Sequence, residues 1–488
     1  MNDKVALGLL HTCVPGLDTL LGGGLPEYSF NLVAGPPGSG KTTLAHQIMF
    51  ALATPERRAL FFTVLGEPPL KMLRYQQQFS FFDVDKVGPA IRYVNLGETL
   101  RAGDFSGVLE RIMAEVEAFS PTLVFVDSFR SVVQTAKPGN EGVADLQYFI
   151  QELGTRMTSW QATTFLIGEY MHADPEANPI VTVADGMLAL SQAHEHSAVV
   201  RKIRVVKMRG RAHLSGSHNF RITDDGLRTY PRILPPLAAD RHPGVEVDVA
   251  PDRIPTGVPG LDALMHGGLP RGHTLLVSGP TGAGKTIIAT RFLQEGVRQG
   301  EKGVAMFFEK GPSRLRNAAL ARMVQHGDVA VVENRLIDLT VDELIDELQM
   351  TLVRTGAKRL VIDSLSEFGL YMAPEFQADL RQAVFRMLSV VAKLGVSALV
   401  TIGHDDDFTS LHFSQTTIAY LTDAIVTLRY AEVDGRIGKF MSVIKVRGSA
   451  HSTDLRGYRI TDEGLEIDAG PTEVTGVLAG GCVRRVGA

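Results

Sequence analysis

The sequence contains little cysteine, little tryptophan and no long apolar run. Its 488 residues include two cysteines, Cys13 and Cys482, and a single tryptophan, Trp160. Because the cysteines lie near opposite ends of the chain, neither a disulfide framework nor a thiolate zinc site is expected, and a reducing cytoplasm is the expected compartment. The longest apolar runs have the length of a strand, and the first residues lack the pattern of a signal peptide. We therefore expect no membrane span and no cleaved leader.

An excess of positive charge is also lacking. The chain has 49 Lys plus Arg against 54 Asp plus Glu, a formal net charge of −5 and a pI of about 6.3. Chains that bind nucleic acid over a broad surface are usually basic, so DNA is not an expected partner. With 44% hydrophobic and 21% charged residues, the composition is that of a folded globular protein. A prior of about 100–200 residues per domain predicts two to four domains.

One long pattern occurs twice in the chain. TCVPGLDTLLGGGLP at residues 12–26 returns as TGVPGLDALMHGGLP at residues 256–270. VVKMRGRAH at residues 205–213 returns as VIKVRGSAH at residues 443–451, and FRITDDGL returns as YRITDEGL. Because the order of the segments is kept over so long a stretch, duplication of one domain explains them best.

The repeat sets the expected domain boundaries. We expect an N-terminal domain at residues 1–230, a proline-rich linker at 231–255, a C-terminal domain at 256–470 and a short tail at 471–488. In each copy, short apolar runs alternate with longer helical stretches. This alternation predicts an α/β fold with a mainly parallel sheet covered by helices on both faces, followed by antiparallel strands at one end of the sheet.

Each copy carries a glycine-rich phosphate-binding pattern. Gly35 to Thr42 and Gly279 to Thr286 both satisfy G-x-x-x-x-G-K-[ST], and each follows an apolar strand and opens a helix. In this context the backbone N–H groups cradle phosphate oxygens, and the lysine neutralises the β and γ phosphates. Thr42 and Thr286 would supply a hydroxyl to Mg²⁺. The alternative, a glycine-rich turn with no ligand, is disfavoured because two matches occur in register.

Acidic residues that follow apolar strands are candidates for metal binding and for catalysis. Asp127 and Asp363 each end such a strand, from which a carboxylate reaches Mg²⁺ directly or through water, although an aspartate there can also cap the next loop. Glu309 stands at the end of the strand after the second P-loop helix, and we expect it to be a general base and a metal ligand. In the first copy Leu65 and Gly66 occupy this place, and the first acid is Glu67, the weaker candidate for a base.

A K-x-R pattern recurs in both copies. Lys207 with Arg209, and Lys445 with Arg447, stand two residues apart, so on a strand each pair projects to one side. Such a pair suits a γ-phosphate, and the alternative is a solvent-facing pair on an edge strand. If these strands lie at a subunit boundary, the cations would reach a neighbour's nucleotide in a ring.

These motifs together resemble the KaiC family of two-domain ATPases over roughly residues 8–470. The resemblance implies two tandem RecA-like P-loop NTPase domains and a double-ring homohexamer, assembled with ATP, that holds ATP and Mg²⁺ between subunits in both tiers. It also implies slow ATP hydrolysis, a timing or signalling role with Kai-type clock or signalling proteins as partners, and Ser/Thr autophosphorylation in some members.

By the same resemblance, nucleotide contacts fall in the two P-loops and on the adjacent subunit. The P-loop contacts are Gly38, Ser39, Gly40, Lys41, Thr42 and Thr43, and Gly282, Ala283, Gly284, Lys285, Thr286 and Ile287. The contacts from the adjacent subunit are Lys207, Met208, Arg209, Arg211, His213, Thr223 and Asp224 in the first tier, and Lys439, Lys445, Val446, Arg447, Ser449, His451 and Thr453 in the second.

The chain departs from the family pattern in three places. The family usually has two adjacent glutamates after the second strand. These positions are occupied by Leu65-Gly66 in the first copy and by Glu309-Lys310 in the second. The acceptor positions of autophosphorylating members are occupied by Ala419 and Tyr420, which disfavours a clock-type phosphorylation cycle because phosphoryl transfer tolerates little misplacement. The tail that follows Asp468 is short and ends basic, so a long regulatory tail that docks a separate activator is not expected.

Two other functions compete with this interpretation. One is a RecA- or RadA-like DNA-dependent ATPase, a recombinase or helicase. The acidic pI, the single tryptophan and the lack of an aromatic and basic stripe weigh against it. The other is a switch in which the first copy binds ATP without turnover and holds the ring together, which the missing acidic pair in that copy favours.

Overall fold

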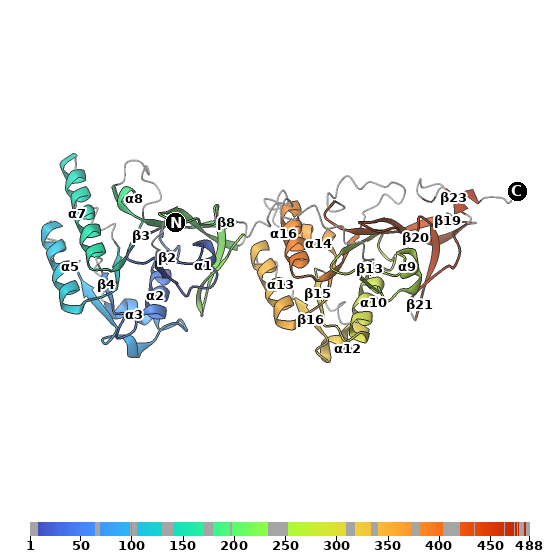
Figure 1. Cartoon of the computed structure of the whole chain (residues 1–488), viewed down its shortest axis with the longest axis horizontal. Helices are drawn as coiled ribbons and strands as arrows, with labels where there is room; N and C mark the ends of the chain where they lie inside the picture. The colour runs from blue at the N-terminus through green and yellow to red at the C-terminus, as the bar shows by residue number, and fades with distance from the viewer. Residues whose placement is uncertain are drawn as a thin grey trace, which may run out of the picture. The chain divides into compact units, whose positions relative to one another are not determined.

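The chain forms two compact units, shown in a computed structural model (Figure 1). They comprise Met1–Ile233 and Leu234–Ala488, and each is described by itself. The structure describes residues 8–484 except 64–68, 98, 100–104, 129–139, 170–178, 196–197, 233–251, 309–317, 333–339, 372–379, 404–419, 434, 463, 473, 476 and 478–482. Within these residues, no helix combines the length and the apolar character needed to cross a membrane.

The first unit is built on a nine-stranded sheet with the order β11-β10-β9-β8-β3-β7-β6-β4-β5. The six strands from β8 to β5 in this order are parallel, and the other three continue the sheet in antiparallel fashion. The strands are β3 (Phe30–Ala34), β4 (Ala59–Thr63), β5 (Ile91–Asn95), β6 (Leu123–Asp127), β7 (Thr163–Gly168), β8 (Gly186–Glu195), β9 (Ala198–Met208), β10 (His218–Thr223) and β11 (Gly226–Tyr230). A short hairpin joins β1 (Leu9–Leu10) to β2 (Leu25–Pro26).

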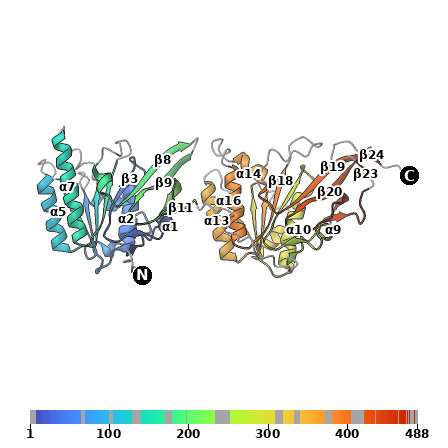
Figure 2. The ribbon, with the colours of Figure 1, turned by 45° about the horizontal axis from the view of Figure 1, so that its top comes forward.

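Helices cover both faces of this sheet, as Figure 2 shows. Two long helices pack on one face, and the helix that follows β3 packs on the other with a separate apolar core. The helices are α1 (Leu17–Leu20), α2 (Lys41–Leu52), α3 (Pro69–Gln76), α5 (Phe105–Phe119), α7 (Asn140–Ser159), α8 (Pro179–Val183) and the 3₁₀ turn Val84–Lys86. Because both faces are covered, β3, β4 and β7 are buried at every residue, which explains their nearly all-apolar sequences.

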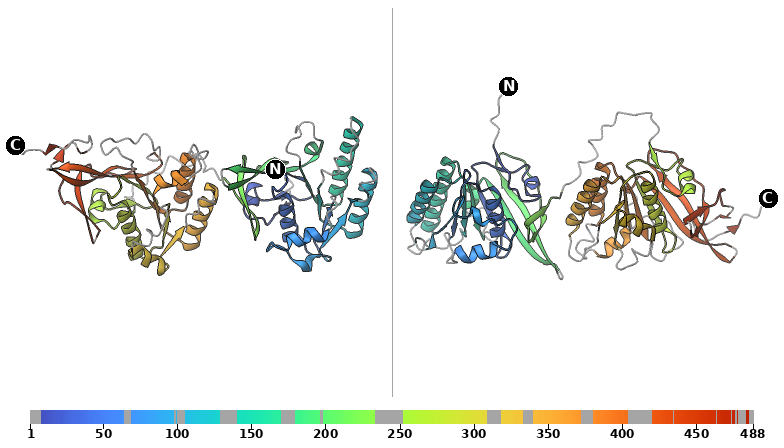
Figure 3. Two further views of the ribbon diagram at one scale, coloured as in Figure 1. Left: turned by 180° about the vertical axis from the view of Figure 1, so that it is seen from behind. Right: turned by 90° about the horizontal axis from the view of Figure 1, so that it is seen from below.

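The second unit repeats this plan (Figure 3). Its strand order is β16-β15-β17-β18-β14-β19-β20-β21-β22. Its strands are β14 (Thr274–Gly279), β15 (Gly303–Phe307), β16 (Val329–Val332), β17 (Arg359–Asp363), β18 (Ser397–Gly403), β19 (Ala424–Val433), β20 (Arg436–Val446), β21 (Arg456–Thr461) and β22 (Gly464–Ile467). Its helices are α9 (Pro259–Leu264), α10 (Lys285–Arg298), α12 (Ala318–Gln325), α13 (Val341–Thr355), α14 (Leu365–Tyr371) and α16 (Leu380–Lys393). Two-residue strands form the pairs β12 (Arg253–Ile254) with β13 (Leu269–Pro270), and β23 (Val474–Thr475) with β24 (Val483–Arg484).

The two sheets confirm the expected fold class. Each unit has the mainly parallel sheet between helices and the antiparallel strands that follow it, as the alternating pattern predicted. The division between the units falls at Ile233 and Leu234, and most of the proline-rich stretch lies outside the described residues.

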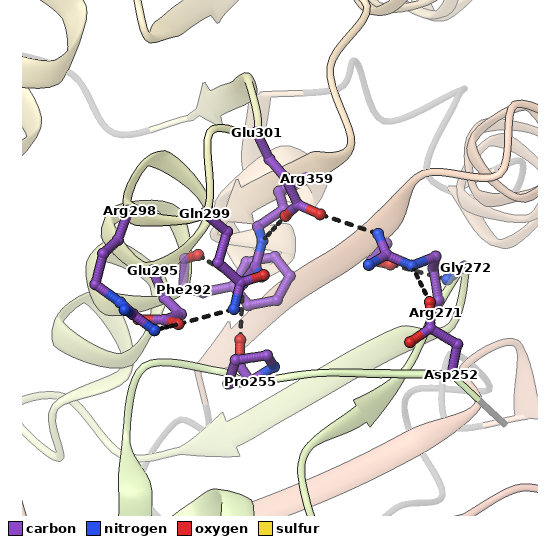
Figure 4. Close-up of polar contacts among 11 residues, drawn as sticks. Asp252, Pro255, Arg271, Gly272, Phe292, Glu295, Arg298, Gln299, Glu301 and Arg359 are labelled. Atoms are coloured by element: carbon purple, nitrogen blue, oxygen red, sulfur yellow. Dashed lines mark hydrogen bonds and ion pairs between the residues drawn. The ribbon is translucent and has the colours of Figure 1, made fainter. Parts of the chain in front are cut away.

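A buried arginine anchors the start of the second unit (Figure 4). Arg359, the first residue of β17, is fully buried, and its Nε donates a hydrogen bond of 2.6 Å to the Glu301 carboxylate. Its Nη1 donates to the carbonyl of Pro255 at 2.8 Å and to that of Phe292 at 3.0 Å. These bonds join the segment after the proline-rich stretch to the carboxyl-terminal half of α10 and to the sheet.

Arg271 extends this network to the surface. Its guanidinium bonds Glu301 at 2.9 Å and Asp252 at 2.7 Å (Figure 4). Although burial raises the pKa of Glu301, the hydrogen bonds from Arg359 and Arg271 hold it below its ordinary value. The equivalent of Arg359 in the first unit is the buried apolar Leu123, the first residue of β6, so this network belongs to the second unit.

Candidate functional site

In each unit the loop between the first long strand and the next helix has the backbone of a phosphate cradle. Gly38 and Gly40 have φ of 74° and 95°, and Gly282 and Gly284 have φ of 79° and 98°. L side chains rarely adopt this left-handed region, so glycine is required there. At Gly35 a Cβ atom would lie 2.5 Å from the Leu190 carbonyl oxygen, so space as well as conformation restricts the loop.

The P-loop lysines fold back over their own loops. Lys41 Nζ donates to the carbonyls of Gly35 at 2.9 Å and Pro36 at 2.8 Å. Lys285 Nζ makes the same two bonds, at 2.7 and 2.9 Å, to Gly279 and Pro280. Burial lowers the pKa of Lys41, and the Asp127 carboxylate partly opposes this effect. Burial likewise lowers the pKa of Lys285 against the opposing charges of Asp363 and Glu367.

The structure brings the P-loop threonine and the strand-end aspartate together in both units. Thr42 Oγ1 donates to Asp127 Oδ2 at 2.7 Å, and Thr286 Oγ1 donates to Asp363 Oδ2 at 2.8 Å. The peptide bond after each aspartate is cis in both units. Thr401 also donates to Asp363, and the sequence analysis did not single it out. A hydroxyl beside one carboxylate fits Mg²⁺, which takes few protein ligands and fills its octahedron with water and phosphate oxygens.

The two candidate general bases lie outside the described residues. Glu67 and Glu309, together with Leu65, Gly66 and Lys310, fall in stretches whose placement the structure does not describe. The strands that precede them end beside the aspartates: Thr63 pairs with Asp127, and Phe307 pairs with Asp363. The last residues of β4 and β15 therefore lie next to the aspartate of the threonine–aspartate pair.

The K-x-R residues lie at the edge of the sheet opposite to their own P-loop. Met208, between Lys207 and Arg209, pairs with Gly186, which pairs with Asn31 near the start of β3. The P-loop follows the other end of β3, so a phosphate bound there lies a full strand length away. Lys207 and Arg209 are therefore not brought together with the nucleotide site of the same unit.

Both pairs of cations are held by the segment that precedes their neighbouring strand, which in the first unit comprises α8 and the residues that follow it. Lys207 Nζ donates to the Val181 carbonyl at 2.9 Å, and Arg209 bonds Asp185 at 3.1 Å. In the second unit Lys445 Nζ donates to the Thr422 carbonyl at 2.7 Å, and Arg447 bonds Asp423 at 3.4 Å. Burial first, and then the adjacent arginine, lower the pKa of each lysine. The residues between the cations, Met208 and Val446, are buried in the core, so only their backbone could contact a ligand.

The loops that follow these strands use arginine differently in the two units. Arg211 Nη2 donates to the Gly22 carbonyl at 2.7 Å. In the second unit the arginine comes from β12 instead: Arg253 donates to the Met265 carbonyl at 2.7 Å and also to Ser449 Oγ. Three other residues expected from the adjacent subunit also lie on these loops. His213 and His451 are partly exposed, and Thr453 is exposed.

Three residues expected to contact the nucleotide of an adjacent subunit lie near the P-loop of their own unit. Thr223 and Asp224 follow Ile222, whose Cδ1 lies 2.7 Å from the place of a Cβ on Gly40. Lys439 pairs with Tyr430, whose hydroxyl donates to the P-loop carbonyl of Thr281 at 3.1 Å. The direction of β10 and β20 in the sheet, which the motif does not reveal, places these residues at this edge, and their contact with a neighbour's nucleotide stays a prediction.

The first unit has a counterpart of Lys439 that sequence reasoning missed. Arg201 pairs with Gln192, whose amide donates to the P-loop carbonyl of Pro37 at 3.3 Å. Arg201 and Lys439 hold the same position in the two copies of the repeat, a signal that could have identified Arg201. In each unit, the side chain that donates a hydrogen bond to the P-loop, Gln192 or Tyr430, is paired across the sheet with a cationic residue, Arg201 or Lys439.

Comparisons with known proteins agree with this geometry. The family model described as "ATPase: KaiC" matches the chain twice, at residues 10–233 and 254–471. The chain is 26% identical to the circadian clock oscillator protein KaiC of Parathermosynechococcus lividus over 480 residues, which cover 94% of this chain and 85% of that protein. It is 27% identical to the circadian clock oscillator protein KaiC 1 of Synechocystis sp., over 94% of this chain and 88% of the relative. For the KaiC of Rippkaea orientalis the identity is 26%, over 99% and 93%.

Proposed function

Because the chain belongs to the KaiC family of ATPases, we propose that it binds Mg-ATP at two sites per chain and hydrolyses it slowly, with a timing or signalling role. The observation that carries this proposal is the hydrogen bond between the P-loop threonine and the strand-end aspartate, which is present in both units. In each unit the P-loop lysine also donates hydrogen bonds to carbonyls of its own loop. ATP phosphates would take the place of the loop carbonyls as partners of Lys41 and Lys285. Thr42 with Asp127, and Thr286 with Asp363, would hold the Mg²⁺ that neutralises the β and γ phosphates.

The position of the K-x-R residues supports a ring of subunits. Lys207 and Arg209 lie at the far edge of the sheet from their own P-loop, so they can reach a γ-phosphate only if another subunit presents it. The same holds for Lys445 and Arg447, which pair across from the start of β19. We extend the proposal to a double-ring homohexamer whose two tiers each hold ATP between subunits.

The two tiers are proposed to differ in turnover. Glu309 is the general base of the second unit, whereas the first unit offers Leu65-Gly66 at the corresponding place and only Glu67 beyond it. The second tier then carries most of the hydrolysis, and the first tier holds ATP for longer. The proposal leaves out Ser/Thr autophosphorylation, because Ala419 and Tyr420 occupy the acceptor positions.

Turnover and assembly test this proposal together. ATP hydrolysis is measured for the wild type, for Lys41→Ala, for Lys285→Ala and for Glu309→Gln, and native mass is measured with and without ATP. We expect a hexamer that requires ATP, and turnover reduced more by Lys285→Ala than by Lys41→Ala. Background turnover in the wild type, a monomer in the presence of ATP, or stimulation by single-stranded DNA would contradict the proposal. Intact mass after incubation, with a gain of about 80 Da per phosphate, reveals any phosphorylation.

A further inference from the structure

A pocket of about 440 Å³ opens in the first unit, at the edge of the sheet opposite to the P-loop. Its walls come from the loops that precede three neighbouring strands: Tyr28 before β3, Ser120 to Thr122 before β6, and Trp160 with Gln161 before β7. Glu117 on the last turn of α5 completes it. The volume lies within the usual range for small-ligand sites, roughly 300–1,000 Å³. None of these residues takes part in the nucleotide site.

The equivalent edge of the sheet in the second unit has different residues at the positions that line this pocket. The backbone N–H of Tyr28 donates to the Thr163 hydroxyl, and that of Gly272 donates in the same way to the Ser397 hydroxyl, which fixes the equivalence of the two edges. Three residues of the pocket have left-handed φ, and glycine stands at all three equivalent positions. The pairs are Tyr28 (61°) with Gly272 (77°), Ser120 (48°) with Gly356 (65°), and Gln161 (54°) with Gly395 (66°).

The presence of Tyr28, Ser120 and Gln161 where the second unit has glycine suggests that the pocket binds a ligand. The backbone turn is the same in both units, and nothing lies within 4 Å of a Cβ placed on any of the three glycines. Packing therefore does not demand a side chain at these positions, yet the first unit keeps three in a conformation that L residues rarely adopt. Non-glycine residues held this way concentrate at functional sites. Trp160 and Glu117 are also specific to the first unit, where the second has Leu394 and Val353.

The lining selects the charge of a ligand. It contains one acid, Glu117, two aromatic residues, Tyr28 and Trp160, and no basic residue. Among the residues that the structure describes, Glu117 has no ion pair, and the buried Thr122 Oγ1 has no hydrogen-bond partner. A carboxylate beside aromatic rings attracts an organic cation and repels phosphate. The hydroxyls and the Gln161 amide add acceptors for its N–H groups.

Nearby basic side chains do not neutralise this carboxylate. On the neighbouring elements, Arg156 pairs with Glu152 at 2.6 Å and Arg111 pairs with Glu115 at 2.7 Å. Arg92 forms an ion pair with Glu115 at 3.8 Å, and the guanidinium carbons of Arg92 and Arg58 lie 4.2 Å and 5.3 Å from the centroid of the Phe119 ring. Each of these cations contacts another partner, so none of them forms an ion pair with Glu117 among the residues that the structure describes.

We infer that this pocket of the first unit binds a guanidinium or ammonium group, with Glu117 as counter-ion and Trp160 and Tyr28 as aromatic walls. The group belongs either to a free small cation or to an arginine or lysine side chain of a partner protein. This site is separate from the ATP sites, and the described residues at the equivalent positions of the second unit lack its glutamate and both aromatic side chains, so a cationic ligand can distinguish the two tiers.

The single tryptophan makes the pocket directly observable. The full chain is titrated with agmatine, a free guanidinium compound, and with a neutral peptide that carries one arginine, while Trp160 fluorescence is recorded. We expect a saturable change with at least one of the two. Glu117→Gln should weaken the apparent affinity at least about tenfold, because it removes the charged partner of the hydrogen bonds. Tyr28→Gly, which installs the residue of the second unit, should weaken it as well.

A matched control separates this site from general electrostatics. Glu110→Gln removes the same charge from an exposed position on the same helix, outside the pocket, and should leave the affinity unchanged. Saturation by agmatine identifies the free cation as sufficient, and saturation by the peptide alone identifies a partner side chain. The inference is overturned if neither probe saturates, if the dianion succinate gives the same response, or if Glu110→Gln weakens binding as much as Glu117→Gln.

Discussion

The buried Arg359 network permits a quantitative test of what stabilises the second unit. Arg359→Leu installs the residue that the first unit carries at the equivalent position, where Leu123 is 1% exposed. The substitution places an apolar side chain at this buried position and removes the hydrogen-bond donors to Glu301, Pro255 and Phe292. Because leucine fits the equivalent position of the first unit, the change in the free energy of unfolding should report the loss of the hydrogen bonds and not a steric clash.

The expected loss follows from the partners left behind. Breaking a buried ion pair by removing one member costs about 3–5 kcal/mol, and Glu301 should fall at the low end because Arg271 still bonds it. The carbonyls of Pro255 and Phe292 lose a donor each, at about 1 kcal/mol apiece, and burial of leucine returns about 1 kcal/mol. We expect a net loss of about 4 kcal/mol. At a urea slope of about 2.5 kcal/mol/M, the midpoint of the second unit falls by about 1.5 M.

Two spectroscopic signals assign this loss to one unit. Urea unfolding is followed by Trp160 fluorescence, which reports the first unit alone, and by far-UV circular dichroism, which reports both. The dichroism transition should move while the fluorescence transition stays. Arg459→Leu, which removes an exposed ion pair with Glu466 in the same unit, serves as the control and should be nearly neutral. A midpoint shift below about 0.4 M, or full additivity with Glu301→Leu, would refute the reasoning.

Three further predictions concern the first unit and its differences from the second. Burial lowers the pKa of His46 from 6.5 to about 4, so the neutral form is favoured in the fold. The free energy of unfolding of this unit should be highest above about pH 6.5 and should fall by about 3 kcal/mol as the pH drops to 4. His46→Thr, which installs the residue found at the equivalent position 290, should abolish this pH dependence. Urea unfolding followed by Trp160 fluorescence measures it. Ser120→Gly should stabilise by about 1 kcal/mol, and Gly356→Ser should destabilise the second unit by a similar amount, because both positions are left-handed; midpoints that move the other way would contradict this. Gly40→Ala should abolish ATP binding at the first site, since φ is 95° and the new Cβ would lie 2.7 Å from the side chain of Ile222, and calorimetric titration with Mg-ATP measures the loss.

Much of the nucleotide site could be predicted from the sequence, because its parts are local. The P-loop requires glycines, a lysine and a threonine within a few residues, and the strand-end aspartates follow short apolar runs that only a buried strand explains. The hydrogen bonds Thr42–Asp127 and Thr286–Asp363 bring these predicted residues together. The repeat predicted two α/β units for the same reason: a pattern that recurs in register needs no knowledge of packing.

The position of the later residues could not be predicted, because strand direction decides it. Lys207 and Thr223 stand close in sequence, yet β9 runs against β8 and β10 runs against β9, so the two residues reach opposite edges of the sheet. For this reason Thr223, Asp224 and Lys439 lie beside their own P-loop, and Lys207 does not.

The sequence by itself therefore determined the features that are written in contiguous residues: two P-loops, the strand-end aspartates that follow them, and the duplication of an α/β unit. Only the tertiary structure decided which residues from distant segments meet, as Arg359 meets Pro255 and as Tyr28, Glu117 and Trp160 meet around one pocket. The physical reason is that contacts between segments far apart in the chain depend on strand order and packing, which a local pattern of residue types does not specify.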